Sequence, residues 1–151
     1  MPSQEEKYSV GMAGEHFVVG ELLRRGIRAS VTMGNAKRAE VVAMNNKATK
    51  VVVAEVKSSP RKEWVVGNVV PQAIKQPWVF VHIAADCSPP RYFIMTASEL
   101  NGILSVEDAN YKEIFIKRHG KPFTGKGVHK LKLTQAEKYE NRWSTIIEQV
   151  S

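Results

Sequence analysis

Two acidic residues and one lysine lie in two neighbouring apolar segments, at a spacing that could bring them together. Glu55 and Lys57 fall in the β-branched run 51–58, and side chains two positions apart on an extended strand point to the same face. Glu40 opens the preceding apolar run, 40–44. A Glu-x-Lys tripeptide on a strand usually forms a solvated ion pair, so the position of the second acid decides what this cluster could do.

The polar segment between the two runs, 45–50, predicts the turn of a β-hairpin. With Met44 opposite Val51, counting back along both strands places Glu40 directly across from Glu55, at the ~5 Å separation of cross-strand neighbours. Like charges at that distance destabilise a sheet unless a cation lies beside them, and Mg²⁺ prefers carboxylate oxygens. A register shifted by one residue would instead move Glu40 to the opposite face.

A divalent ion on these two acids would suit hydrolysis of a phosphodiester. Mg²⁺ held by one or two carboxylates keeps several waters, one of which can attack phosphorus. Lys57 would orient that water or stabilise the charge that develops on the phosphoryl oxygens. The sequence therefore predicts a magnesium site, in which Mn²⁺ would substitute.

The elements that must position these residues alternate between helical and extended patterns. Apolar residues recur at helical spacing from 8 to 25, and Gly26 is a good C-terminal helix cap. Strands besides the hairpin are predicted at 27–33, 78–84 and 92–95. This order indicates an α/β fold with a central mixed sheet of about five strands flanked by helices.

The connecting segments carry weaker signals. Residues 60–64 predict a turn or loop, and 69–76 a short helix or an irregular crossover. Thr96 and Glu99 have the capping-box spacing that starts a short helix, and Thr134 with Glu137 repeats it before a terminal helix. The stretch 102–129 predicts a loop with one possible strand around 114–116.

Composition favours one domain, residues 1–151, in the cytoplasm. No apolar run approaches the ~18 residues of a membrane helix, and a single cysteine excludes an internal disulfide. Lys and Arg outnumber Asp and Glu by 22 to 15, for a net charge of +7, which favours a polyanionic partner such as nucleic acid. A merely cationic surface explains the charge equally well.

Several other residues suit binding more weakly. The basic residues that could contact a nucleic-acid backbone, or equally form a solvated loop, are Lys117, Arg118, Lys121, Lys126 and Lys130. The four histidines lack metal-ligand spacing, so zinc is not expected. Gly125-Lys126-Gly127 lacks the order of a phosphate-binding loop, and both Trp64 and Trp78 are expected in the core.

The hairpin and the helix before it resemble the PD-(D/E)XK nuclease superfamily, which includes restriction enzymes and archaeal Holliday-junction resolvases. The resemblance runs from about 10 to 83. Gly14-Glu15 within the first helix looks like the family's first helix, whose glutamate often joins the metal site. Glu55-Val56-Lys57 is similar to the (D/E)XK tripeptide, and Gln72 to a glutamine of resolvase-like members. Glu40 stands where the family usually has aspartate.

The resemblance implies a restriction endonuclease-like core and a Mg²⁺-dependent nuclease that cuts DNA. Glu40 and Glu55 would hold the metal, Lys57 would assist, Glu15 would support from the first helix, and Gln72 would be accessory. No recognition helix is evident, so a structure-selective or repair-type role is expected, and a homodimer follows by analogy. The alternative is a catalytically silent module of the same fold that binds nucleic acid or a protein partner.

Overall fold

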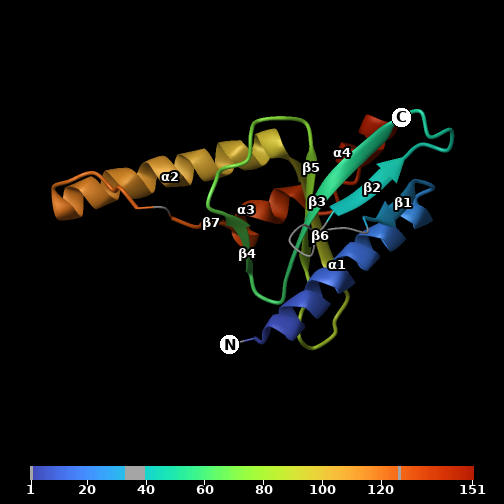
Figure 1. Ribbon diagram of the computed structural model, residues 1–151, viewed down its shortest axis with the longest axis horizontal. Helices are drawn as coiled ribbons and strands as arrows, with labels where there is room; N and C mark the ends of the chain where they lie inside the picture. The colour runs from blue at the N-terminus through green and yellow to red at the C-terminus, as the bar shows by residue number, and fades with distance from the viewer. Residues whose placement is uncertain (1, 33–39, 126) are drawn as a thin grey trace.

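The computed structural model describes residues 2–32, 40–125 and 127–151, which form a mixed five-stranded sheet with helices on both faces (Figure 1). Its strands are β1 (Arg28–Val31), β2 (Glu40–Met44), β3 (Val51–Ser59), β5 (Pro77–His82) and β6 (Arg91–Thr96). Their order is β1-β2-β3-β5-β6, with β3 and β5 parallel and the other neighbours antiparallel. The prediction of an α/β fold with a mixed sheet is confirmed.

The β2–β3 hairpin has the register predicted from its symmetry. Met44 pairs with Val51 and Glu40 pairs with Glu55, without a shift between them. The turn is held by Asn45, whose side-chain oxygen accepts hydrogen bonds from the backbone N–H groups of Thr49 (2.9 Å) and Lys50 (3.2 Å). A local side-chain bond of this kind fixes the loop length and therefore the pairing.

The first helix, α1 (Gln4–Arg24), begins earlier than the apolar pattern predicts because Ser3 and Glu6 form a reciprocal capping box. It ends before Gly26, which has the left-handed φ of 81° expected of a cap. The helix lies close against β3 at Gly14, where an added Cβ would come within 1.7 Å of the Ser58 Oγ. A residue without a side chain therefore sets the distance between α1 and the sheet.

Two apolar clusters cover the two faces of the sheet. The cluster on the α1 side includes Val18 and Leu22 of α1 and Ala54 and Val56 of β3. The cluster on the other side contains Trp64, Trp78, Phe80 and Phe93, together with Leu100 and Leu104 of α2 (Ala97–His119). Trp64 and Trp78 are thus in the core, as predicted.

A second, two-stranded sheet was not predicted. Its strands, β4 (Glu63–Gly67) and β7 (His129–Lys132), pair antiparallel, so Glu63 lies opposite Lys132. The turn predicted at 60–64 is confirmed for residues 60–62 but is wrong for 63 and 64. Those two residues belong to β4, and Trp64 packs in the core. Residues 68–76 form the irregular crossover to β5, one of the two alternatives that the sequence left open.

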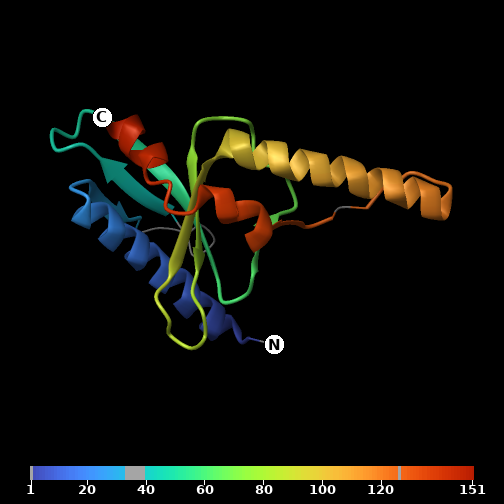
Figure 2. The same ribbon diagram turned by 180° about the vertical axis from the view of Figure 1, so that it is seen from behind.

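Helix α2 overturns the predicted loop over 102–119 and the strand at 114–116, whereas residues 120–125, 127 and 128 form a loop as predicted. It starts at the predicted capping box of Thr96 and Glu99 but continues for 23 residues to Gly120, whose φ of 68° ends it. Its buried residues all lie in its first two turns, and its remainder extends away from the sheets as an arm (Figures 1 and 2). Such a polar helix lacks the long apolar stripe by which sequence patterns reveal helices.

The C-terminal segment is broken where one helix was predicted. It comprises α3 (Leu133–Ala136), the 3-10 turns η1 (Glu137–Tyr139) and η2 (Glu148–Val150), and α4 (Ser144–Ile147) between them. Glu140 bridges Phe93 of β6, and the N–H of Asn141 donates to the Tyr92 carbonyl at 2.8 Å. This pairing along the edge of the sheet competes with helical hydrogen bonds and interrupts the helix.

Within the described ranges, none of the helices combines the length and the apolar character needed to cross a bilayer.

Candidate metal and phosphate site

The two predicted acids lie across from each other at the start of the β2–β3 ladder. Glu40 and Glu55 are direct register partners, and neighbours of this kind have Cβ atoms ~5 Å apart. The Glu55 side chain is 8% exposed and Glu40 is half-buried. Both acids also have interaction partners within the protein. The hairpin thus brings two carboxylates to one place on the sheet, next to its core.

Lys57 is on the same face of β3 as Glu55. Ala54 and Val56 pack beneath α1, so the alternating residues point to the opposite face. On that face the partners of Glu55 and Lys57 in the parallel strand are Trp78 and Phe80, both members of the aromatic cluster. The charged residues therefore adjoin an apolar wall, where electrostatic interactions are stronger than in water.

Glu15 is placed on α1, which covers the other face of the sheet. Its carboxyl is half-buried, and burial raises its pKa while the neighbouring His16 acts in the opposite direction. Nowhere in ranges 2–32, 40–125 and 127–151 do three or more His, Cys, Asp or Glu side chains form a group that could hold a metal. Among the described residues, Glu15 therefore does not join Glu40 and Glu55 in a group of this kind.

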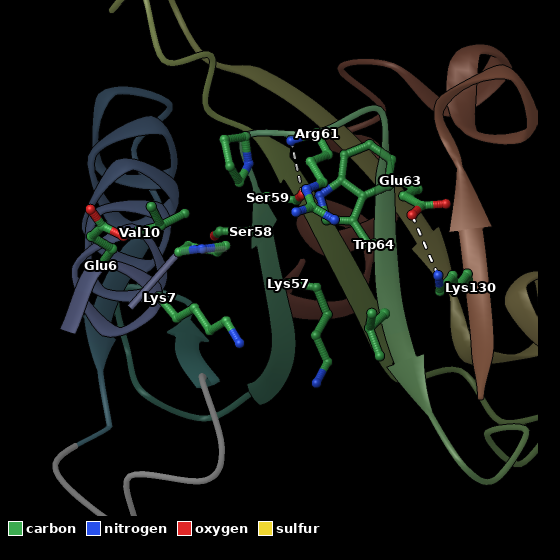
Figure 3. A pocket seen from close by; sticks show the side chains of 13 residues that line it. Glu6, Lys7, Val10, Lys57, Ser58, Ser59, Arg61, Glu63, Trp64 and Lys130 are labelled. Atoms are coloured by element: carbon green, nitrogen blue, oxygen red, sulfur yellow. Dashed lines mark hydrogen bonds and ion pairs between the residues drawn. The ribbon is translucent and has the colours of Figure 1, made fainter. Parts of the chain in front are cut away.

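A cavity of about 500 Å³ opens where the β2–β3 ladder stops (Figure 3). The ladder begins at Glu40 and Glu55, whereas β3 continues to Ser59 beside β5. The cavity lies between the N-terminal turns of α1, the end of β3 and the small sheet. Its lining residues are Pro2, Glu6, Lys7, Val10, Lys57, Ser58, Ser59, Pro60, Arg61, Glu63, Trp64, Val65 and Lys130. We call it the Lys57 cavity.

The Lys57 cavity has basic side chains around an apolar interior. Its four basic residues are Lys7, Lys57, Arg61 and Lys130, against two acids, one of which, Glu63, lies 3.5 Å from the Lys130 ammonium. The side chains of Lys7 and Lys57 extend toward the same side of the opening (Figure 3). An anionic group would be attracted to this opening. Neither Glu40 nor Glu55 lines the cavity, but Lys57, which does, lies two positions after Glu55 on β3.

Sequence patterns did not single out Lys7 or Arg61. Lys7 belongs to the first turns of α1 and Arg61 to the loop between β3 and β4, so they meet Lys57 only through the tertiary fold. The one usable signal was position, because Pro60, Arg61 and Lys62 directly follow the strand that carries Glu55 and Lys57. A basic loop after such a strand is well placed to bind a phosphate backbone.

The predicted basic tract does not form one surface. Lys117, Arg118 and Lys121 lie at the far end of the α2 arm, where Lys117 is 3.4 Å from Glu113 and 73% exposed (Figures 1 and 2). Lys130 lies instead on β7 and lines the Lys57 cavity. Lys126 falls outside the described residues.

Gln72, the predicted accessory residue, lies in the irregular crossover and is exposed. Comparisons of the chain with protein-family models, with curated proteins and with solved structures find no match.

Proposed function

We propose that the protein is a metal-dependent nuclease with a restriction endonuclease-like core, which hydrolyses phosphodiester bonds in DNA. The observation that carries the proposal is the pairing of Glu40 with Glu55 on the sheet face that also carries Lys57. The Lys57 cavity, which Lys57 itself lines, supports it, because a phosphate there would lie among basic side chains. The mixed sheet and its flanking helices are compatible with such a core.

The donor set fits a hard divalent cation. Glu40 and Glu55 would hold Mg²⁺ or Mn²⁺, since these ions commonly bind through one or two carboxylates. The bound ion would supply Lewis-acid activation of the phosphodiester. No described histidine or cysteine joins the acids in a group that could hold a metal, so the ligands are oxygens, which suit magnesium or manganese better than zinc.

Lys57 would act on the phosphate itself. Its ammonium emerges from the face that carries Glu55 and lines the cavity, where it can donate hydrogen bonds to phosphoryl oxygens as negative charge builds up on them. The adjacent aromatic cluster limits the access of water on one side and strengthens this interaction. Glu15 is assigned a subordinate role, because α1 covers the other face.

The test is cleavage of supercoiled, single-stranded and branched DNA in Mg²⁺, Mn²⁺ or EDTA. We expect metal-dependent cutting by the wild type and a loss of about 100-fold or more in Lys57→Ala, Glu55→Gln and Glu40→Gln. Glu15→Gln should reduce the rate of cleavage by a smaller factor than Glu55→Gln. The matched control is Lys112→Ala, because Lys112 is 53% exposed on the α2 arm and pairs with Asp108 there.

Circular dichroism of each variant shows whether the fold is intact. Cleavage that is unaffected by EDTA, or equal rates in the wild type and Lys57→Ala, would contradict the proposal. Binding of DNA without any cleavage would favour the second candidate, a silent module of the same fold. The observation that favours this candidate is that the described residues offer a pair of acids, without a third metal-ligating side chain.

A further inference from the structure

The Lys57 cavity combines two kinds of surface that few ligands match together. The side chains of Val10, Pro60 and Val65 contribute apolar surface, and Lys7, Lys57, Arg61 and Lys130 contribute positive charge. A nucleotide has the same two parts, a flat base and an anionic phosphate. The volume of about 500 Å³ lies within the roughly 300–1,000 Å³ range of small-ligand sites.

We infer that the Lys57 cavity binds one unpaired nucleotide, next to the phosphate on which Lys57 acts, and that the substrate is therefore a single-stranded or frayed DNA strand. This inference rests on the proposed function. It names the form of substrate, which the paired acids by themselves do not specify.

The position of Lys57 links the cavity to the two acids. Lys57 lines the cavity and shares its strand face with Glu55, which lies two positions earlier and does not itself line the cavity. A strand bound along this face would therefore pass from the acids to the cavity. The phosphate nearest Lys57 would face Glu40 and Glu55, and the neighbouring nucleotide would enter the cavity. The cavity thus continues the path of a strand beyond the point of cleavage.

The surroundings of the cavity favour an unpaired nucleotide over a base pair. Helix α1 contributes Lys7 and Val10 from one side, and strand β4 contributes Trp64 and Val65 from another. A base that is stacked in a duplex must leave its stack to enter such a pocket, which costs free energy, whereas an unpaired base has little stacking to lose. Single strands should therefore bind more tightly than duplexes.

Arg61 is the residue whose removal tests the cavity most cleanly. It lies in the exposed loop between β3 and β4, so its truncation should leave the core and the paired acids unchanged. Its guanidinium can bind a phosphate through two parallel hydrogen bonds. Lys112→Ala on the α2 arm again serves as the control for loss of one positive charge.

The experiment measures fluorescence anisotropy of labelled oligodeoxythymidylate, of the same sequence annealed to its complement, and of an abasic strand of equal length, all in EDTA. We expect the single strand to bind about ten-fold more tightly than the duplex. The abasic strand should bind about ten-fold more weakly than the normal single strand, because it lacks the base that would occupy the cavity. Arg61→Ala should weaken single-strand binding about five-fold, and Lys112→Ala by less than about two-fold.

Equal affinity for single strand and duplex, or equal affinity for the abasic and the normal strand, would overturn the inference. Cleavage assays separate this failure from failure of the proposed function. If the wild type cuts both forms equally and Lys57→Ala cuts neither, the nuclease proposal stands and the inference fails. If single strands bind selectively through Arg61 but are never cut, the inference about binding stands and the nuclease proposal fails.

Discussion

One face of the five-stranded sheet is mainly aliphatic and lies directly against α1, whereas the other is richer in aromatic residues and carries the paired acids. Ala54 and Val56 of β3 belong to the first face, and Glu55 and Lys57 of the same strand to the second. At Gly14 the first face leaves no space even for a methyl group. The second face passes from a packed aromatic cluster to charged side chains at a cavity.

The difference shows how one strand can serve stability and chemistry together. A side-chain period of two sends alternate residues to environments of opposite character, so β3 packs against α1 through one set and carries the residues of the proposed site in the other. Small aliphatic residues allow the helix to approach closely. Bulky aromatic residues instead support the small sheet, which forms a wall of the Lys57 cavity.

The largest effect on stability should come from truncating Trp64, the largest side chain that the small sheet packs into the aromatic cluster. Trp64 is 1% exposed and donates its indole N–H to the Val81 carbonyl at 3.0 Å. Its ring packs at a tilt against Phe80 and edge-on against Phe93, at centroid distances of 5.4 and 5.5 Å. We expect Trp64→Ala to lower the free energy of unfolding by about 3–5 kcal/mol in chemical denaturation. Trp64→Phe keeps an aromatic ring but removes the hydrogen bond to Val81, and it should lower the free energy of unfolding by about 1–3 kcal/mol.

The aliphatic face should be most sensitive at Gly14. Gly14→Ala forces its new methyl group against Ser58 and should lower the free energy of unfolding by about 1–3 kcal/mol, measured by denaturation. Gly20→Ala is the matched control, because its Cβ meets nothing within 4 Å and should stabilise the helix by up to about 1 kcal/mol. Adding Ser58→Gly to Gly14→Ala should recover part of the loss. Equal behaviour of Gly14→Ala and Gly20→Ala would contradict the close approach of α1.

The C-terminal segment joins the two faces, since Tyr139 packs in the aromatic cluster and Trp143 in the aliphatic one. Between them, Glu140 accepts two hydrogen bonds from Arg91, at 2.8 and 2.9 Å, and these lower the pKa of the Glu140 carboxyl below its ordinary 4.5. A lowered pKa in the folded state means that the stabilisation is present above pH 4.5 and is lost as the pH falls through the folded-state value.

We therefore expect acid to destabilise the wild type more steeply than Glu140→Gln, in unfolding curves recorded across that range of pH. At neutral pH, where the partly exposed pair is screened by solvent, the substitution should cost about 1 kcal/mol or less. Parallel curves for the two proteins below pH 4.5 would show that this pair does not link the two faces.

The smallest expected effect concerns the ionisation of Tyr92, which packs on the α1 side of the sheet. Burial, followed by the charge of Glu21, raises the pKa of Tyr92 to about 12. Because the pKa is raised, the stabilisation holds below the ordinary value of 10.0 and is lost as the pH rises through about 12. Absorbance of the phenolate should show an ionisation near pH 12 that disappears in Tyr92→Phe. A wild-type titration without this late step would mean that the phenol is solvated.

The β2–β3 hairpin could be predicted because its information is local. A symmetric register followed from the lengths of two apolar runs and the polar turn between them, and the structure confirms Glu40 opposite Glu55. The α2 arm could not be predicted in this way. Beyond Leu104 it has no buried residue to impose a helical period, and Gly102 in its first half favours a loop on propensity alone.

The cavity could not be predicted because its walls meet only through the tertiary fold. Glu63 pairs with Lys132 in the small sheet, although the whole of α2 lies between these two residues in the sequence. This pairing brings Lys130 to the cavity that Lys57 also lines. The break in the C-terminal helix has a similar cause, since the N–H of Asn141 donates to the Tyr92 carbonyl of β6 instead of to a helical partner. The helix that precedes the break is capped at Lys132 and Gln135, so the predicted capping box of Thr134 and Glu137 is wrong. Such long-range pairings leave no periodic signal in a sequence.

The most direct test of the central claim is a calorimetric titration of the protein with Mn²⁺. We expect a site that is weakened about ten-fold or more in Glu40→Gln and in Glu55→Gln, as for loss of a metal ligand. Glu113→Gln, on the α2 arm, should match the wild type. A wild type without Mn²⁺ binding, or variants at 40 and 55 that bind like it, would contradict the claim that the paired carboxylates form a metal site.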